Sequence, residues 1–381
     1  MVTVYFATNR ARVNGREVFG DDTIPGDAGR LAFGSAEVAL TPKTAGAAEN
    51  KLAHADHVGR IDVFARSASD GLRRPPGSSR LIGRLQRAIF DQGKDLLIYI
   101  HGYDTTFREA VWYGAQIKLQ YNWLLKGQAK SIEDLGGRAP QGLEVLVFSW
   151  PSAGKALAYP WEFGRITQRG WHLGIARLLT EITTLIGGDR GKALLDGIVS
   201  LREADLIELL KNGGPALPGR LHVLAQSMGA RMLGQGFDVY ASGLRDVRGL
   251  VPLFQTVLLT GADVDADAFE SGGPLEKLPQ ITDRTVVYYN EGDFLGLLSG
   301  LIWGKARMSR RGLADPSAVP AASDVDVTAV IGGEADPFGH YYARMNERVI
   351  ADILYVMGDT PPGRITGRKR DGYRNAFALE P

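Results

Sequence analysis

The part of the sequence that most constrains the fold is segment 220–238, in which a strand-like run, a turn and a helical pattern follow one another. Residues 221–225 are mostly apolar and have the length of a buried strand. Ser227 lies in the turn, and apolar residues recur at helical spacing after it. A serine in a sharp turn between a strand and a helix stands clear of the sheet, as a catalytic serine must. The segment therefore predicts a nucleophile elbow with Ser227 as the nucleophile.

Small residues flank the predicted turn on both sides, as the close packing of strand against helix requires. Ala225 lies two positions before the serine and Gly229 lies two positions after it. The usual pattern has glycine at both positions, so Ala225 is a departure. A serine that only caps a helix after a strand gives the same local pattern. The rest of the chain must decide between these two interpretations.

The composition is that of a globular protein with a substantial core, because 44% of the 381 residues are hydrophobic and 23% are charged. The formal net charge of +1 gives no reason to expect a nucleic-acid partner. There are 0 cysteines, which excludes disulfides, thiolate metal sites and a cysteine nucleophile.

The amino terminus lacks the pattern of a secretion signal, and no apolar run approaches the ~20 residues of a membrane span. We therefore expect a cytoplasmic protein without an integral membrane segment.

Buried strands and helical patterns alternate through most of the chain. Apolar runs indicate strands at residues 96–100, 144–150, 221–225, 256–260, 285–290 and 326–331. Helical patterns occupy much of the sequence between these runs. This alternation predicts an α/β protein with a mostly parallel, doubly wound sheet and helices on both of its faces.

The same pattern suggests how the chain is divided. We expect a strand-rich amino-terminal extension of the sheet at residues 1–70, a core formed by 71–151 and 216–358, a helical insertion or cap at 152–215, and a polar tail at 359–381. The insertion is inferred because the stretch between two successive strands is too long for a simple crossover. The tail contains a short basic run, which we interpret as solvated rather than as a nucleic-acid site.

In a doubly wound sheet the functional residues follow the carboxyl ends of the strands. After the strand at 96–100 comes a glycine loop, and Gly102 there allows a close approach of backbone. Acyl transfer needs two N–H donors directed at the developing oxyanion. We expect these donors from Met228, which follows the nucleophile, and from Tyr103, with Asp104 as the alternative to Tyr103. His101 is interpreted as a structural hydrogen-bonding residue.

An acid and a base follow two later strands. Asp293 comes soon after the strand at 285–290, and His340 lies in a loop before the final helix. Their order after Ser227 is the Ser, Asp, His order of hydrolases with a nucleophile elbow. Asp263 is the alternative acid, because it follows the strand one place earlier in the chain.

The sequence gives no support for a metal or another cofactor. Asp263, Asp265 and Asp267 have the D-x-D-x-D spacing of a calcium loop, but Ala268 replaces the expected glycine and the final glutamate is missing. The chain contains neither a phosphate-binding P-loop motif nor an H-E-x-x-H zinc motif. We therefore expect a reaction carried by side chains alone.

Several motifs together resemble one protein family. They are Phe-Ala-Thr-Asn-Arg at residues 6–10, His-Gly-Tyr at 101–103, Phe-Ser-Trp-Pro-Ser-Ala-Gly at 148–154, Ala-Gln-Ser-Met-Gly at 225–229 and Ala-Asp-Val-Asp at 262–265. The chain is similar in these motifs to bacterial α/β-hydrolases catalogued as uncharacterised proteins of the esterase/lipase superfamily. The resemblance implies Ser227 as nucleophile, Asp293 as acid and His340 as base. Gln226 departs from it, because the family usually has histidine there, and many members carry a leader, whose pattern the first residues of this sequence do not show.

These observations predict a serine hydrolase that cleaves carboxylic esters through an acyl-enzyme. The alternatives are a catalytically idle binding protein of the same fold, and peptidase or acyltransferase chemistry on the same triad. The apolar segment 294–303 follows the acid, so Phe294, Leu297 and Trp303 are expected to line a substrate pocket or to belong to a lid. A buried packing helix is the other interpretation of this segment. The expected substrate is a small-molecule or lipid-like ester.

Overall fold

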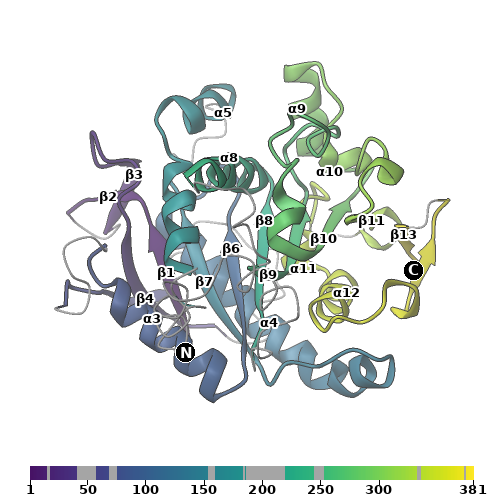
Figure 1. Cartoon of the computed structure of the whole chain (residues 1–381), viewed down its shortest axis with the longest axis horizontal. Coiled ribbons are helices and arrows are strands. Elements are labelled where there is room, and N and C mark those ends of the chain that lie inside the picture. Colours follow the sequence, from purple (N-terminus) through teal and green to yellow (C-terminus); the bar gives the residue numbers. More distant parts are fainter. Residues whose placement is uncertain are drawn as a thin grey trace, which may run out of the picture.

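A computed structural model describes residues 1–14, 18–40, 57–67, 75–152, 159–182, 185, 219–243, 253–332, 336–372 and 375–381 (Figure 1). Its centre is an 11-stranded sheet. In order across the sheet, the strands are β12 (Arg368–Arg370), β13 (Ala376–Leu379), β11 (Ala322–Asp326), β10 (Thr282–Tyr289), β9 (Phe254–Thr260), β8 (Leu221–Gln226), β6 (Asp95–Ile100), β7 (Leu143–Ser149), β1 (Val2–Thr8), β4 (Ala32–Val38) and β5 (Val58–Val63).

The direction of the strands confirms the α/β fold that the sequence predicts. All neighbours from β13 to β1 pair in parallel. Among the described strands of this sheet, antiparallel pairs lie at the two edges, where β4 joins β1, β5 joins β4 and β12 joins β13. Helices pack on both faces, so the sheet is doubly wound.

The buried strands distribute their side chains between two cores. Ile98 of β6 belongs to a cluster that also contains residues of α3 (Ser78–Gln86) and α8 (Met228–Gly243). Leu97 belongs to a second cluster, with residues of α4 (Phe107–Asp134) and α12 (Glu347–Met357). Because successive side chains of a strand point to opposite faces, each face of the sheet is covered by its own helices.

Helix α4 begins as the sequence pattern indicates. The Thr106 side chain accepts a hydrogen bond from the Glu109 N–H, and the Glu109 side chain accepts one from the Thr106 N–H. These two bonds form the capping box that a threonine followed three positions later by a glutamate predicts, and they fix the point at which the loop after β6 becomes helix. Figure 1 shows α4 along the lower side of the view, while α5 (Tyr159–Gln168), α8 and α9 (Phe294–Trp303) lie along the upper side.

Short elements complete the described part of the chain. They are the π-helix Arg87–Asp91, the 3-10 turns Leu278–Ile281, Pro316–Ala318, Thr328–Val330 and Pro362–Arg364, and the helices α10 (Met308–Arg311) and α11 (Tyr342–Met345). No helix in the described ranges combines the length and the apolar character that crossing a bilayer requires.

The amino-terminal segment contains a hairpin that sequence reasoning missed. Residues 7–30 are rich in glycine, aspartate and arginine, a composition that predicts a loop, but β2 (Arg10–Arg12) and β3 (Phe19–Thr23) pair there in antiparallel fashion. The strands are short and largely polar, so their pattern is that of a loop. Phe19 anchors the hairpin, because its ring centroid is 4.7 Å from that of Phe107.

Two boundaries near the carboxyl end differ from the prediction. A strand was expected at 326–331, but β11 ends at Asp326, whose Oδ1 accepts a hydrogen bond from the Thr328 N–H at 2.8 Å. Apolar residues at helical spacing predict a single final helix over 341–357, but Asn346 separates α11 from α12. Its side chain accepts hydrogen bonds from two N–H groups of the first turn of α12, so it caps a new helix.

The last residues of the chain belong to the sheet rather than to a solvated tail. β13 pairs in parallel with β11, and β12 pairs with β13. Arg368, which belongs to the basic run, is buried and pairs with the buried Asp352 at 2.6 Å. The expectation of a solvated tail was wrong, because the apolar residues of β13 are mostly buried against the sheet and the Arg368 side chain has a buried counter-charge.

The predicted helical insertion is described only at its beginning. Helix α5 ends near Gly170, whose φ of 67° turns the chain, and residues 173–182 form the next helix. The expected apolar face is confirmed here, because Trp171, Ile175 and Leu178 are buried in the first core cluster. The helical pieces expected at 190–200 and 203–212 lie outside the described residues, and the division into domains stays a prediction.

Candidate active site

Ser227 lies in the sharp turn between β8 and α8. Its φ of 55° is in the left-handed region, which non-glycine residues seldom adopt. Its N–H donates a hydrogen bond to the Thr260 carbonyl at 3.0 Å, so the turn is tied to the neighbouring strand β9. A side chain at Gly229 would place its Cβ 2.5 Å from the Ile100 carbonyl oxygen, so only glycine fits there. The local geometry is the strand, turn and helix that the sequence predicts.

The loop after β6 closely approaches the serine. A Cβ added at Gly102 would lie 2.8 Å from the Cβ of Ser227 and 3.4 Å from its Oγ. The glycine therefore lets the backbone of this loop reach the hydroxyl. Tyr103 follows in the same loop, and Asp104 has a φ of 55°, which turns the chain toward α4. Met228 is the first residue of α8, so its N–H has no acceptor within the helix.

His101 is part of the support of this loop. Its Nδ1 donates to the Gly102 carbonyl at 2.7 Å, and its Nε2 accepts from the Trp150 N–H at 3.2 Å. Its ring stacks on that of Trp150, with the centroids 5.2 Å apart. Burial, together with the positive charge of Arg10, lowers the pKa of His101 to about 3. The imidazole is thus neutral and each of its ring nitrogens makes a hydrogen bond, as expected for a structural residue.

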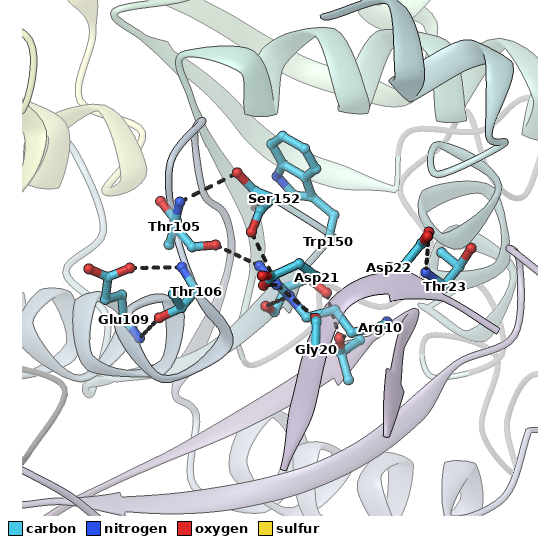
Figure 2. A network of polar contacts seen from close by, with 12 residues as sticks. Arg10, Gly20, Asp21, Asp22, Thr23, Thr105, Thr106, Glu109, Trp150 and Ser152 are labelled. Carbon is cyan, nitrogen blue, oxygen red and sulfur yellow. Dashed lines mark hydrogen bonds and ion pairs between the residues drawn. The ribbon is translucent and has the colours of Figure 1, made fainter. Parts of the chain in front are cut away.

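Arg10 joins the amino-terminal hairpin to the same loop, as Figure 2 shows. Its side chain is buried and donates to the Thr105 carbonyl at 2.6 Å and to Ser149 Oγ at 3.0 Å. It also donates to the carbonyls of Gly20 at 3.0 Å and Ser152 at 3.4 Å. One guanidinium therefore fixes β3, the end of β7 and the loop after β6. Sequence reasoning flagged the segment 6–10 as a motif but assigned no role to this arginine.

Asp293 and His340, the predicted acid and base, are brought together by the fold. Asp293 Oδ2 accepts a hydrogen bond from His340 Nδ1 at 2.7 Å, and both side chains are buried. The other oxygen, Oδ1, accepts from the Gly296 N–H at 2.9 Å and caps helix α9. The carboxylate is therefore held by one helix end and one imidazole, and it fixes the orientation of His340.

The charges around His340 favour its protonated form. Burial by itself lowers the pKa of this histidine, but the charge and hydrogen bond of Asp293 act in the opposite direction and outweigh it. Asp336 and Asp263 add to this effect, so the pKa of His340 is raised above its ordinary value of 6.5. An imidazole in this environment takes up a proton more readily than one that is merely buried.

The histidine lies beside the nucleophile turn. A Cβ added at Gly261 would be 3.0 Å from both Cε1 and Nδ1 of His340, and Gly261 directly follows the residue that holds the Ser227 N–H. No hydrogen bond joins Ser227 Oγ to His340, although the structure describes both residues. Catalytic hydrogen bonds are often long without substrate and shorten when it binds.

Asp263, the alternative acid, is bound to other partners. Its Oδ2 accepts from the Tyr159 hydroxyl at 2.5 Å, and its Oδ1 accepts from Ser299 Oγ at 2.6 Å. Arg307 lies 3.6 Å from the same carboxylate. The hydrogen bond to His340 belongs to Asp293, so the geometry favours Asp293 as the acid. Sequence reasoning missed all three partners of Asp263, since they come from distant parts of the chain.

The neighbouring Asp265 is also paired with basic side chains. Asp265 pairs with Arg307 at 2.5 Å and with Lys305 at 2.9 Å. In the portion of the chain that the structure describes, no three histidine, aspartate or glutamate residues are grouped so as to hold a metal ion.

The residues expected to line a substrate pocket lie on helix α9, directly after the acid. Phe294 is 46% exposed, Leu297 is 37% exposed and Trp303 is 38% exposed. The interpretation of this segment as a buried packing helix is therefore wrong. Only Gly296 and Ser299 of this helix are buried, so its large side chains face solvent.

Comparison with known proteins gives one finding. The model of a family described as "Alpha/beta hydrolase of unknown function (DUF900)" matches residues 82–181. No curated protein and no solved structure matches the chain. The matched residues contain β6, α4 and β7, but they end before Ser227. The likeness therefore agrees with the sheet topology in supporting an α/β-hydrolase fold, and it leaves the chemistry of the site to be argued from geometry.

Proposed function

We propose that the protein is a serine hydrolase that cleaves carboxylic esters through an acyl-enzyme. The observation that carries this proposal is the buried Asp293–His340 hydrogen bond of 2.7 Å beside the strained turn of Ser227. An acid that orients a histidine, next to a serine held at a strand–helix turn, is the arrangement that activates a hydroxyl for attack on a carbonyl.

In this mechanism His340 is the general base. Its Nδ1 is bound to Asp293, so Nε2 is the nitrogen that takes the proton from Ser227 Oγ. The serine oxygen attacks the ester carbonyl, and His340 then gives the proton to the departing alcohol. Water releases the acyl group by the same steps, with the histidine again serving as base. Asp293 stabilises the imidazolium that forms in each half of the reaction.

The negative charge on the carbonyl oxygen requires two N–H donors. We assign them to Met228, whose N–H is free of the helix bonds of α8, and to Tyr103 in the loop beside the serine. Each such donor stabilises the transition state by roughly 3 kcal/mol. The close approach of Gly102 to Ser227 and the support from Arg10 and His101 favour this assignment.

The same residues would serve a peptidase or an acyltransferase, which differ from an esterase in the leaving group or the acceptor. Gln226 is the residue at which this chain departs from the hydrolases that it resembles, since those usually have histidine before the nucleophile. It is buried, and its Oε1 accepts a hydrogen bond from the Tyr99 hydroxyl at 2.9 Å. A structural role of this kind does not interfere with the triad, so the departure gives no support to an idle site.

The test is labelling with a small fluorophosphonate, followed by measurement of the intact protein mass. We expect one adduct on the wild type and none on the Ser227→Ala variant. Hydrolysis of short p-nitrophenyl esters should be lost in the same variant, and added alcohol or amine acceptors would reveal acyl transfer. A well-folded wild type that neither reacts nor hydrolyses esters would contradict the proposal and favour a binding protein.

A further inference from the structure

Helix α9 has an arrangement of side chains that is reversed relative to an ordinary surface helix. Its 10 residues, Phe-Leu-Gly-Leu-Leu-Ser-Gly-Leu-Ile-Trp, include no charged residue. The residues buried against the protein are Gly296 and Ser299, whereas Leu301 is 73% exposed and Ile302 is 48% exposed. A surface helix normally buries its apolar face and exposes its polar one.

The exposed apolar residues form one surface, which we call the α9 face. It consists of Phe294, Leu297, Leu298, Leu301, Ile302, Trp303 and Phe338. These are seven of the twelve large hydrophobic residues that are exposed in the described part of the chain. Phe338 belongs to it because its ring lies 6.3 Å from that of Phe294 and its carbonyl accepts the Phe294 N–H. Such a concentration marks a binding surface.

The inner side of the helix is fixed by polar and close contacts, so the exposure is a property of the fold. Asp293 caps the first turn, and Ser299 donates to Asp263 Oδ1 at 2.6 Å and is 2.6 Å from the Tyr159 hydroxyl. A Cβ added at Gly296 would be 2.1 Å from Ser309 Oγ. Rotating α9 to bury its leucines would break these contacts and force large side chains into the space that Gly296 leaves.

The size and composition of the α9 face indicate what covers it. A stable protein interface uses roughly 20–30 residues from each partner, which is far more than this face offers. Exposed leucines and an exposed tryptophan with basic residues nearby suit the boundary of a bilayer, where tryptophan is enriched; Arg311 is exposed beyond Trp303, and Lys305 is exposed although it pairs with Asp265. Trp303 suits the headgroup level, and basic side chains that follow the helix, such as Arg311, are attracted to anionic lipids.

We propose that the α9 face is a docking surface for the surface of a phospholipid bilayer that contains anionic lipid. The helix lies flat in the boundary with its leucines toward the acyl chains, and Trp303 lies at the headgroups. Because the helix begins at Asp293, docking brings the candidate triad to the bilayer surface. If the proposed esterase activity holds, the substrates are esters presented there. Binding itself does not depend on that activity.

Sedimentation with vesicles tests this inference on the full-length chain. The vesicles are made of phosphatidylcholine with phosphatidylglycerol, and the bound fraction is measured against lipid concentration. We expect the wild type to bind, and the double variant Leu301→Ser/Ile302→Ser to bind at least about tenfold more weakly, because two apolar side chains no longer leave water. Both side chains face solvent, so thermal unfolding of this variant should match that of the wild type.

Two tryptophans provide a matched pair of variants. Trp303→Ala changes the α9 face, whereas Trp123→Ala changes α4 at a residue that is 53% exposed. We expect a several-fold loss of vesicle binding from Trp303→Ala alone. Equal losses from both variants would mean nonspecific adsorption and would overturn the proposal.

The catalytic hypothesis is kept separate by Ser227→Ala, which should bind vesicles as the wild type does whether or not the wild type hydrolyses esters. Absence of vesicle binding by the wild type would overturn the inference and leave the proposed chemistry untouched. A dimer in solution that the Leu301→Ser/Ile302→Ser variant abolishes, without vesicle binding, would assign the α9 face to a second copy of the chain and would also overturn it.

Discussion

Two buried histidine–aspartate pairs lie at opposite ends of the central parallel strands. At the amino end, His222 Nε2 is 3.0 Å from Asp95 Oδ2, and these residues belong to the adjacent strands β8 and β6. At the carboxyl end, His340 Nδ1 is 2.7 Å from Asp293 Oδ2, and both residues lie in segments that follow strands. Both pairs are buried and both join a histidine nitrogen to an aspartate oxygen, so these two features alone do not tell a catalytic pair from a structural one.

Their surroundings separate them. Asp95 also accepts hydrogen bonds from the backbone N–H and the Nε of Arg220, at 2.8 and 3.1 Å. Its negative charge therefore faces the Arg220 guanidinium as well as the His222 ring. Burial lowers the pKa of His222 by more than Asp95 raises it, whereas the pKa of His340 is raised. His222 is five residues before Ser227, about 16 Å along an extended strand. The difference teaches that a histidine–aspartate pair becomes a candidate for catalysis through its position in the sheet and the charges around it.

The largest effect that would test this comparison is the loss of activity in Asp293→Asn. Without the carboxylate, the histidine is no longer held in the right tautomer and its imidazolium is not stabilised. We expect kcat on a simple ester to fall by roughly 10³ to 10⁴-fold. Asp263→Asn is the matched change at the alternative acid and should cost far less, since Asp263 has no hydrogen bond to His340. A larger loss in Asp263→Asn would transfer the role of acid to that residue.

Asp95→Asn should show the opposite profile, with a large effect on stability and a small one on catalysis. An asparagine leaves the buried Arg220 without its counter-charge, which costs about 3–5 kcal/mol of unfolding free energy. Asp293→Asn should change stability by less than about 1 kcal/mol, since asparagine caps a helix as well as aspartate does. Urea unfolding, with ester hydrolysis per folded molecule, measures both quantities. If Asp95→Asn abolished catalysis in a folded protein, the contrast between the two ends of the sheet would fail.

Arg10 offers a way to sharpen the contrast, because it holds the loops at the carboxyl end from a distance. Arg10→Met leaves several buried carbonyls without a donor, and we expect a loss of about 3 kcal/mol of stability. The loop after β6, which carries the proposed oxyanion donor Tyr103, should loosen as well, so kcat should fall in the molecules that remain folded. Arg169→Met is the control, since Arg169 pairs with Asp22 on the same hairpin but both side chains are about half exposed. Its removal should cost at most about 1 kcal/mol.

Equal stability losses in Arg10→Met and Arg169→Met would mean that the buried network adds nothing beyond a surface ion pair. An unchanged kcat in Arg10→Met would show that the loop after β6 keeps its shape without the arginine. Either result would limit the role of the hairpin to packing.

The parts of the site that could be predicted from the sequence are those whose signal is local. The elbow at Ser227 needs only a strand, small neighbours and a helix within a few residues. Asp293 and His340 were proposed as acid and base from their order along the chain, and the fold places them within hydrogen-bond distance. The capping box of α4 likewise depends on two residues in adjacent positions, Thr106 and Glu109.

The parts that escaped prediction depend on contacts between distant segments. Arg10 bonds to residues 95 and 139 positions away, and nothing in the local pattern selects those partners. β13 is an apolar strand of only 4 residues at the end of a mostly polar segment, and its place is set by pairing with the distant strand β11. A uniformly apolar segment such as α9 normally packs in a core. Its exposure follows from the contacts of Gly296 and Ser299, which composition does not reveal.

The smallest expected effect concerns the pH dependence of the reaction. His340 must be neutral to take a proton, and its raised pKa places the acid limb of kcat/KM at a midpoint above pH 6.5. Asp336→Asn removes one of the negative charges that raise this pKa, so the midpoint should move to lower pH. The change is nearly isosteric. Asp336 Oδ2 accepts a hydrogen bond from the Tyr341 N–H at 2.6 Å, and the side-chain oxygen of an asparagine can accept the same bond. Asp238→Asn, on the exposed side of α8, should leave the midpoint where it is. A midpoint that moved to higher pH in Asp336→Asn would show that the acid limb of kcat/KM reports the titration of a group other than His340.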